Sequence, residues 1–259
     1  MNIRYLLSGI ALLCGGIAHA HMPYLLPATF DLGKRTHIAV QSAFGEDAFD
    51  PEVAMRDAPF HIVTPAGTPG TLGQIAYLRD LSMFEADLPS EGTYRISTGQ
   101  RLGRKGKMVR VGKDWAMRGE DGDLPKDAPA VDVQSATLAE AYVTRGTTTD
   151  AALKPTGQAL EIQPVTHPNA ITAGSSAAFI LLFDGKPLAD TEVTLFRAAG
   201  RHDGRKIAGT VKTDAAGRFA FRITQSDLYL LLARHRTAAP AGADTPYRSY
   251  TYTLAFDAA

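Results

Sequence analysis

A histidine at position 21 is the residue of this sequence best placed to support chemistry. Residues 18–20 read Ala-His-Ala, a small-x-small pattern that predicts signal peptidase cleavage after Ala20. Cleavage there makes His21 the first residue, so its α-amine and ring Nδ1 can chelate a divalent metal together. The α-amine has a pKa near ~8, so its deprotonation by a metal at neutral pH costs little. Nitrogen ligands of this kind suit Cu(II) best, then Ni(II) or Zn(II).

A second histidine is needed because a transition metal takes three or four ligands. His235 is our first choice, since it ends a predicted strand over residues 228–235, where a site could open. A terminal histidine that binds nothing and a partly buried, structural His235 are the competing interpretations. The alternative amino-terminal copper site, which uses backbone amides of the second and third residues, is excluded because Pro23 has no amide proton.

Residues 1–20 predict a secretory signal peptide and therefore a periplasmic location. Arg4 supplies the positive charge, and the apolar run over residues 6–17 is too short to span a bilayer. A retained anchor is the alternative, as is lipidation of Cys14, which Leu13 disfavours. Cleavage removes Cys14, the one cysteine of the chain, so we expect neither a disulfide nor a thiolate metal site.

The composition excludes several classes of protein. The chain has 259 residues, of which 45% are hydrophobic, enough to bury a core rather than remain disordered. Lys plus Arg and Asp plus Glu are 27 each, so no basic excess is present to bind nucleic acid. Only the N-terminal apolar run raises the question of a membrane span, and we expect a protein that is not an integral membrane protein.

The motifs of the common enzyme classes are missing. The sequence has no Gly-x-Ser-x-Gly elbow, no P-loop, no His-Glu-x-x-His and no dinucleotide fingerprint. Glu46-Asp47 is an adjacent acidic pair, and adjacent strand residues point to opposite faces, so we interpret it as solvated loop charge. A copper oxidase with a histidine brace is the enzymatic alternative. No substrate groove can be deduced from the sequence, and we expect no enzyme.

Short, alternating apolar runs separated by turn residues predict an all-β fold. In the second half the expected strands cover residues 177–183, 191–196, 206–213, 218–223, 228–235 and 249–256. In the first half they cover residues 36–43, 60–64, 75–86, 93–98, 108–111 and 139–144, and residues 112–130 are expected to form a long surface loop.

These runs predict two immunoglobulin-like β-sandwich domains after the signal peptide. The expected boundary lies in the Gly- and Pro-containing stretch of residues 146–157. We therefore divide the chain into a signal peptide (1–20), an N-terminal β domain (21–155) and a C-terminal sandwich (156–259).

Five segments carry a resemblance to a known family. They are His21 with the following LLP (residues 25–27), GEDAFDPE (45–52), TRGTTTDAALKPTGQALEIQPVTHPN (144–169), DGKPLADTEVT (184–194) and TDAAGRF (213–219). Together they resemble a bacterial periplasmic family of unknown function that is often labelled the periplasmic component of an ABC-type cobalt or nickel transport system.

The resemblance implies a secreted β protein that binds a transition metal. His21 and His167 match positions where that family often has histidine, and Asp47 matches a frequent acidic position in GEDAFDPE. The expected ligand set is therefore His21, His235, His167 and Asp47, the metal is nickel, cobalt or copper, and an inner-membrane metal transporter is the expected partner. The alternative function is a non-catalytic binding or structural module with a protein or glycan partner and no metal.

Overall fold

The computed structural model describes residues 21–112, 114–119, 124–125 and 127–259. The predicted signal peptide and Cys14 lie outside these described residues. Almost every regular element is a β-strand, which confirms the all-β prediction. Among the described residues, no helix is long and apolar enough to cross a membrane.

The strands of the first half pack as a sandwich. They are β1 (Met22–Pro27), β2 (His37–Gly45), β3 (Val53–Ala54), β4 (His61–Val63), β5 (Ala76–Tyr77), β6 (Ser82–Asp87), β7 (Gly92–Ser97), β8 (Arg101–Val111), β9 (Asp114–Met117) and β10 (Ala130–Arg145). Strands β1, β2, β6 and β5 form one sheet in that order, with β3 on β2. This sheet faces β4, β7 and β10, because Leu25, Val40 and Phe84 share a buried cluster with Ile96 and Val143.

The second half forms another sandwich. Its strands are β11 (Leu160–Pro164), β12 (Ser176–Phe183), β13 (Lys186–Pro187), β14 (Glu192–Arg197), β15 (Ile207–Lys212), β16 (Arg218–Arg222), β17 (Asp227–Ala238) and β18 (Tyr247–Ala258). Its short helices are the 3-10 helices η1 (Ala151–Leu153) and η2 (Pro168–Ala170) and the α-helix α1 (Gly200–Asp203). Strands β11, β12, β16 and the two-residue β13 form a four-stranded sheet. This sheet packs on β15, β14, β17 and β18, which are neighbours in that order. Two packed sheets of this kind form the immunoglobulin-like sandwich that the sequence predicted.

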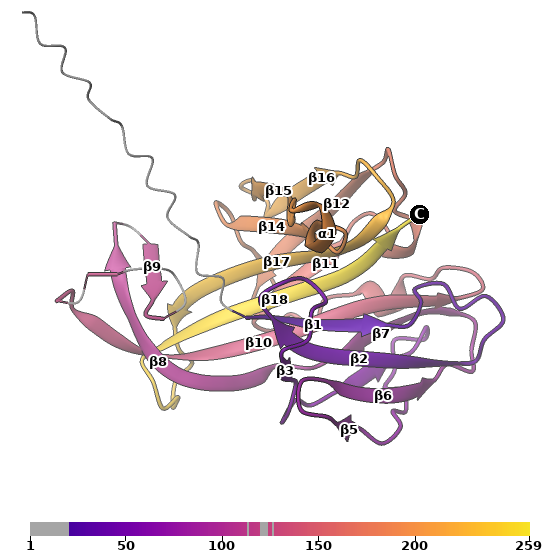
Figure 1. Ribbon diagram of the computed structural model, residues 1–259, viewed down its shortest axis with the longest axis horizontal. Helices are drawn as coiled ribbons and strands as arrows, with labels where there is room; N and C mark the ends of the chain where they lie inside the picture. Colours follow the sequence, from indigo (N-terminus) through magenta and orange to yellow (C-terminus); the bar gives the residue numbers. More distant parts are fainter. Residues whose placement is uncertain (1–20, 113, 120–123, 126) are drawn as a thin grey trace, which may run out of the picture.

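The two sandwiches are joined through one sheet. Strand β10 pairs in parallel with β18, and Ala136 lies beside Tyr250. The pairing makes a nine-stranded sheet that runs across the molecule (Figure 1). The proposed boundary between residues 155 and 156 stays a prediction, because strands on both sides of it contribute to this sheet.

The shared sheet is buried on both faces where the sandwiches meet. Along β17, Leu230 and Leu232 belong to the first buried cluster, whereas Tyr229 and Leu231 belong to the second. Side chains alternate between the two faces of a strand, so the first sandwich covers one face and the second covers the other. The near-continuous apolar sequence of β17 follows from this double burial.

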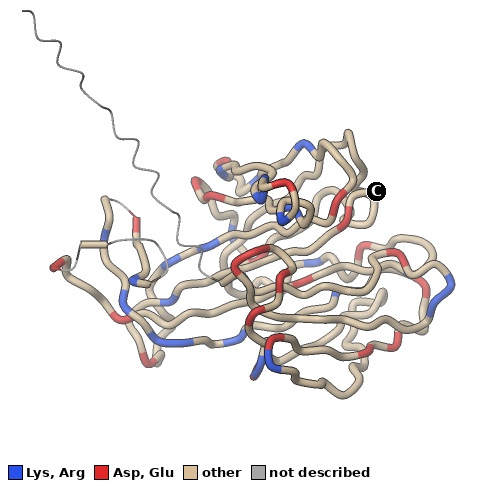
Figure 2. Tube along the Cα trace, viewed as in Figure 1, with Lys and Arg blue, Asp and Glu red and all other residues tan. Residues whose placement is uncertain are grey.

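A three-stranded ribbon extends the shared sheet beyond both sandwiches. Strand β8 pairs with β10 and with β9, and Met108, Met117 and Val133 form a small core of their own. The prediction of a continuous loop over residues 112–130 is therefore wrong for Asp114–Met117, which form β9. Lysines and arginines gather along β8 (Figure 2).

A buried polar cluster lies where β7, β10 and β18 meet. Arg95 Nε is 3.8 Å from Glu140 Oε1, and both side chains are less than a tenth exposed. Tyr252 donates its hydroxyl to Glu140 Oε2 at 2.5 Å, and Arg95 donates to the carbonyl of Lys154 at 3.2 Å. Burial raises the pKa of Tyr252 well above its usual value, and the charge of Glu140 adds to the effect. This cluster ties the sheet to the chain segment between the two sandwiches.

Candidate metal site

The pairing of β1 with β2 brings His21 to an acidic loop. The two strands are antiparallel, and Met22 lies opposite Gly45 at the end of the ladder. His21 precedes Met22 and Glu46 follows Gly45, so the antiparallel pairing brings His21 and Glu46 next to each other. The loop that starts at Gly45 returns at Glu52, whose backbone N–H donates to the carbonyl of Phe44 at 2.9 Å.

The loop has a fixed shape. A Cβ on Gly45 would lie 1.9 Å from the carbonyl oxygen of Asp50, so only glycine fits there. Phe49 adopts a positive φ of 64°, and its side chain is buried with the ring centroid 5.6 Å from that of Tyr24. An aromatic anchor in the core and a closely packed turn hold the loop against the first sandwich.

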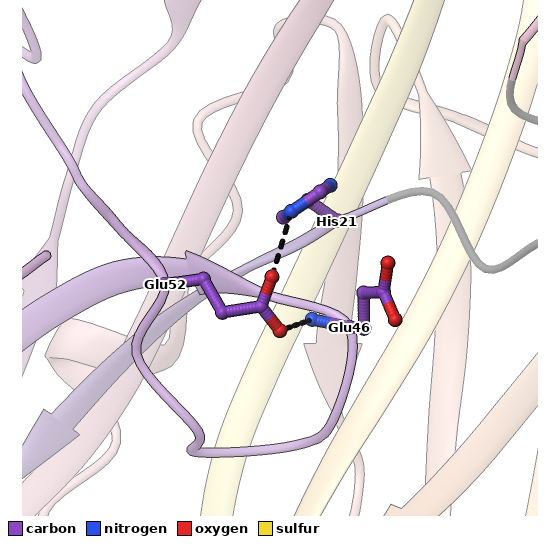
Figure 3. A group of neighbouring side chains, drawn as sticks. All are labelled: His21, Glu46 and Glu52. Carbon is purple, nitrogen blue, oxygen red and sulfur yellow. Dashed lines mark hydrogen bonds and ion pairs between the residues drawn. The ribbon is translucent and has the colours of Figure 1, made fainter.

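Three exposed side chains of this region form a group with donor atoms for a metal. Each of His21, Glu46 and Glu52 offers one atom within 4.8 Å of the others, and within the described part of the chain they are the one such group. The two carboxylates lie on either side of the imidazole in Figure 3. All three side chains are open to solvent, so an ion could enter and leave without opening the core.

The hydrogen bonds of Glu52 determine which imidazole nitrogen stays available. Its Oε2 lies 2.9 Å from Nε2 of His21, and its Oε1 accepts from the backbone N–H of Glu46 at 3.0 Å. When Nε2 carries the proton and donates to Glu52, Nδ1 keeps its lone pair. After cleavage at the predicted position, Nδ1 would be the nitrogen that can chelate a metal together with the α-amine of the same residue. A carboxylate in this position orients the ring and strengthens it as a ligand.

The other two carboxylates of the loop have basic partners. Asp47 Oδ1 is 2.6 Å from Nζ of Lys206, and Asp50 Oδ1 is 2.9 Å from Arg201 of α1. These pairs attach the loop to the second sandwich and offset two of its negative charges. Asp47, which the resemblance implied as a ligand, is therefore engaged with Lys206 and does not belong to the group around His21.

His167 lies away from His21 and has a structural environment. Its Nδ1 accepts from the backbone N–H of Asn169 at 3.2 Å, capping η2, and its Nε2 lies 3.0 Å from Oγ1 of Thr93. This network places the ring proton on Nε2. Burial lowers the pKa of His167, although hydrogen bonding at Thr149 and the charge of Asp150 oppose the shift. The neutral ring joins β7 to the start of the second sandwich.

His235 also lies outside the group. It is in β17, and its ring centroid is 4.7 Å from that of Phe183 in β12. Arg234, the preceding residue, points to the opposite face and lines a cavity with His21. Burial lowers the pKa of His235, against a smaller opposing effect of Asp184. The structure thus does not bring His235, His167 or Asp47 to His21.

Glu46 and Glu52 are the members of the group that the sequence did not identify. Glu46 was interpreted as solvated loop charge, and Glu52 was noted only within GEDAFDPE. One signal was present: an acidic loop between two predicted β segments, close to a terminal histidine. Without the register of β1 on β2 that signal could not be converted into a distance.

The sequence matches one protein family over most of its length. The family is described as "Domain of unknown function (DUF4198)", and the match covers residues 18–237. The chain belongs to this family. No curated protein matches the sequence.

Several solved structures give weak matches. The Yersinia pseudotuberculosis adhesin InvE is 14% identical, with 89% of this chain and 58% of that chain covered and a TM-score of 0.24. The D0-D1 domain of Intimin is also 14% identical, with 90% and 96% covered and a TM-score of 0.24. A DUF4785 family protein of Legionella pneumophila is 10% identical, with 81% and 50% covered and a TM-score of 0.25. At these TM-scores the matches carry no argument about function.

Proposed function

We propose that this member of the DUF4198 family is a secreted protein that binds one divalent transition metal ion through the mature amino terminus. The observation that carries the proposal is the convergence of His21, Glu46 and Glu52, within 4.8 Å of one another, on a loop of fixed shape. Cleavage after Ala20 then adds a further donor, the α-amine of His21, beside these side chains.

The ligands divide into two kinds. The α-amine and Nδ1 of His21 form the chelate, and the carboxylate of Glu46 supplies an oxygen ligand from the loop. Glu52 orients the imidazole through its hydrogen bond to Nε2 at 2.9 Å. Two nitrogens and one oxygen favour Cu(II) over Ni(II), and Ni(II) over Co(II), by the general order of affinities.

The exposure of the group supports a role in handling metal rather than in storing it. The side chains of His21 and Glu52 are 43% and 39% exposed, so a partner can approach the ion directly. We infer that the protein works in the periplasm and passes nickel, cobalt or copper to an inner-membrane transporter. An exposed site with few protein ligands releases its ion more readily than an enclosed site does.

The decisive experiment compares two amino termini. A cleavable fusion is processed to leave either His21 or the extension Gly-Pro-His21 as the amino terminus, and Cu(II) and Ni(II) are titrated into each protein by calorimetry. The extension converts the amine of His21 into an amide, and its proline has no amide proton with which to build a replacement backbone chelate, so we expect the affinity to fall about a hundredfold or more. Equal thermal unfolding of the two proteins is the control.

Equal metal affinity of the two proteins would contradict the proposal that the α-amine of His21 is a ligand. Elemental analysis of protein purified from native periplasm then separates the proposal from its alternative. A stoichiometric transition metal supports the proposal. Metal-free protein that binds neither Cu(II) nor Ni(II) would leave the alternative of a non-catalytic binding module.

A further inference from the structure

A groove of about 500 Å³ lies on the sheet of β1, β2 and β6, next to the place where β17 begins and β18 ends. Its volume is within the range of small-molecule sites, so the groove suits a ligand of that size. It shares no lining residue with the group of His21, Glu46 and Glu52. Most of its lining is apolar and includes Leu26, Ala28, Phe30, Ala39, Met83 and Leu228.

The floor of the groove is formed by side chains that point away from the core. Val40 and Phe84 belong to the first buried cluster, so the adjacent Gln41 and Met83 point to the opposite face of the sheet. Leu26 lies opposite Gln41, and Gln41 lies opposite Met83, so these three side chains form one row across the strands. The row supplies a mainly apolar surface on the side of the sheet that faces solvent.

Two alanines make the next row of the floor. The backbone N–H of Ala28 donates to the carbonyl of Ala39 at 2.9 Å, so the two residues are direct neighbours on β1 and β2. Their methyl groups fill little space, and the floor is therefore low between Met83 on one side and Phe30 with Leu228 on the other. Methylene groups placed there would leave water for an apolar surface.

One carboxylate belongs to the lining. Asp257 of β18 lies opposite Leu228 of β17, and it is exposed, so a ligand can reach its oxygens. It forms no ion pair with any described residue. The apolar surroundings remove part of its water, which raises the pKa of Asp257 above its ordinary value; a hydrogen bond from its own backbone N–H opposes the rise, and the charge of Asp31 adds to it.

The negative charge at this end of the groove has no basic partner in the described part of the chain. Asp31 Oδ1 accepts from the backbone N–H of Gly33 at 2.9 Å, and Asp31 also forms no ion pair there. Lys34 and Arg35 follow in the same loop, and neither of them lines the groove or pairs with these carboxylates. A cation beside Asp257 would offset both negative charges.

We propose that this groove binds a small organic cation, in which an ammonium group is carried on an apolar chain or ring. The apolar body lies between Met83 and Leu228, and the ammonium pairs with the carboxylate of Asp257. A neutral ligand of the same shape would leave the carboxylate without a partner, and an anion would be repelled by it. The inference is independent of the proposed metal site, because the two sets of residues do not overlap.

The test uses three probes with the same eight-carbon chain, titrated by calorimetry into metal-free protein at neutral pH. They are octylammonium, octanol and octanoate. We expect octylammonium to bind about tenfold or more tightly than octanoate, with octanol between them. Methylammonium keeps the charge and lacks the chain, so it should bind about a hundredfold or more weakly than octylammonium.

Two variants separate the charge from the apolar surface. Asp257→Asn should weaken octylammonium binding about tenfold and leave octanol binding within about twofold, because it removes only the charge. Ala39→Phe places a ring in the groove from an exposed strand position, so it should weaken both probes about tenfold or more.

Each variant has a matched control outside the groove. Asp127→Asn changes the net charge equally at an exposed residue before β10, and Ala220→Phe introduces the same ring at an exposed position of β16. Both controls should keep octylammonium affinity within about twofold of wild type. The proposal is overturned by equal binding of octylammonium and octanoate, by an equal loss in Asp127→Asn, by unchanged affinity in Ala39→Phe, or by no octylammonium binding at millimolar concentration.

Discussion

Two of the carboxylate–base clusters of this molecule differ sharply in burial. In the cluster of Arg95, Glu140 and Tyr252, the side chains of the ion pair are 8% and 7% exposed. In the pair of His21 and Glu52 they are 43% and 39% exposed. A buried charge must keep its partner, whereas an exposed one can exchange its partner for an ion at little cost. The first arrangement is suited to holding the fold together, and the second to binding.

The largest expected effect is on the buried cluster. Glu140→Ala leaves the guanidinium of Arg95 buried without its partner and removes the acceptor of Tyr252, so the free energy of unfolding should fall by about 3 kcal/mol or more. Urea denaturation measures the free energy of unfolding. The quadruple variant Arg95→Met, Glu140→Leu, Tyr252→Phe and Tyr142→Phe removes the ion pair together with the two buried hydroxyls next to it, and should recover most of the loss. A single variant that costs less than about 1 kcal/mol would contradict the structural role.

Gly45→Ala tests the loop that positions the exposed cluster. The new Cβ would collide with the carbonyl of Asp50, at 1.9 Å, so the backbone must move and stability should fall by about 1–3 kcal/mol. The movement displaces Glu52, so Cu(II) affinity should fall in the same variant. Gly106→Ala is the control, because its new Cβ would meet only the flexible end of Met117 at 3.0 Å. Calorimetry and denaturation of both variants decide whether loop shape and metal affinity are linked.

Glu52→Gln changes the exposed cluster without moving the loop. The amide orients the imidazole less well than the carboxylate does, so metal affinity should fall about tenfold. The free energy of unfolding of the metal-free protein should change by less than about 1 kcal/mol, since the pair is exposed. Glu85→Gln, an exposed carboxylate on β6, should leave the affinity unchanged. A loss of stability as large as the loss of affinity would make Glu52 a structural residue.

The smallest effect concerns pH and two half-buried histidines, His167 and His235. Burial lowers the pKa of His167 below the ordinary value of 6.5. The unfolded chain then binds more protons than the folded chain below pH 6.5, so stability falls as the pH falls through that value. The loss ends only below the folded pKa. His167→Gln should flatten this part of the stability profile, and His235→Gln should flatten it further, because burial also lowers the pKa of His235.

Local patterns predicted many of the strands, but not β1 or β11. The alternation of Phe219 and Phe221 predicted residues 218–223, and β16 covers Arg218–Arg222. Strand β10 was predicted only over residues 139–144, whereas it spans Ala130–Arg145. Its first part pairs with β8 in the ribbon outside the two sandwiches, so fewer of its residues are buried than in its second part. The parallel pairing with β18 joins distant segments, and no local pattern encodes it.

The candidate site was predictable in part. The sequence around Ala20 singled out His21 and predicts its chelate of α-amine and Nδ1, and this chelate stays a prediction. His235 and His167 were predicted as the other ligands because they are histidines. In the structure His235 packs against Phe183, and His167 is hydrogen-bonded to Thr93 and Asn169. Glu52 reaches His21 because a glycine-dependent turn reverses the chain within a few residues. A turn of this kind sets a spatial neighbour that residue spacing alone does not reveal.

The seam between β10 and β18 has a consequence for how the polypeptide matures. A ribosome delivers β18 after every other strand described, and that strand borders the interior of each sandwich. Contacts between segments so far apart form late and slowly. A nascent chain without residues 247–258 leaves apolar surfaces of both halves exposed, so a premature stop codon before Tyr247 would yield an aggregating fragment rather than a working half.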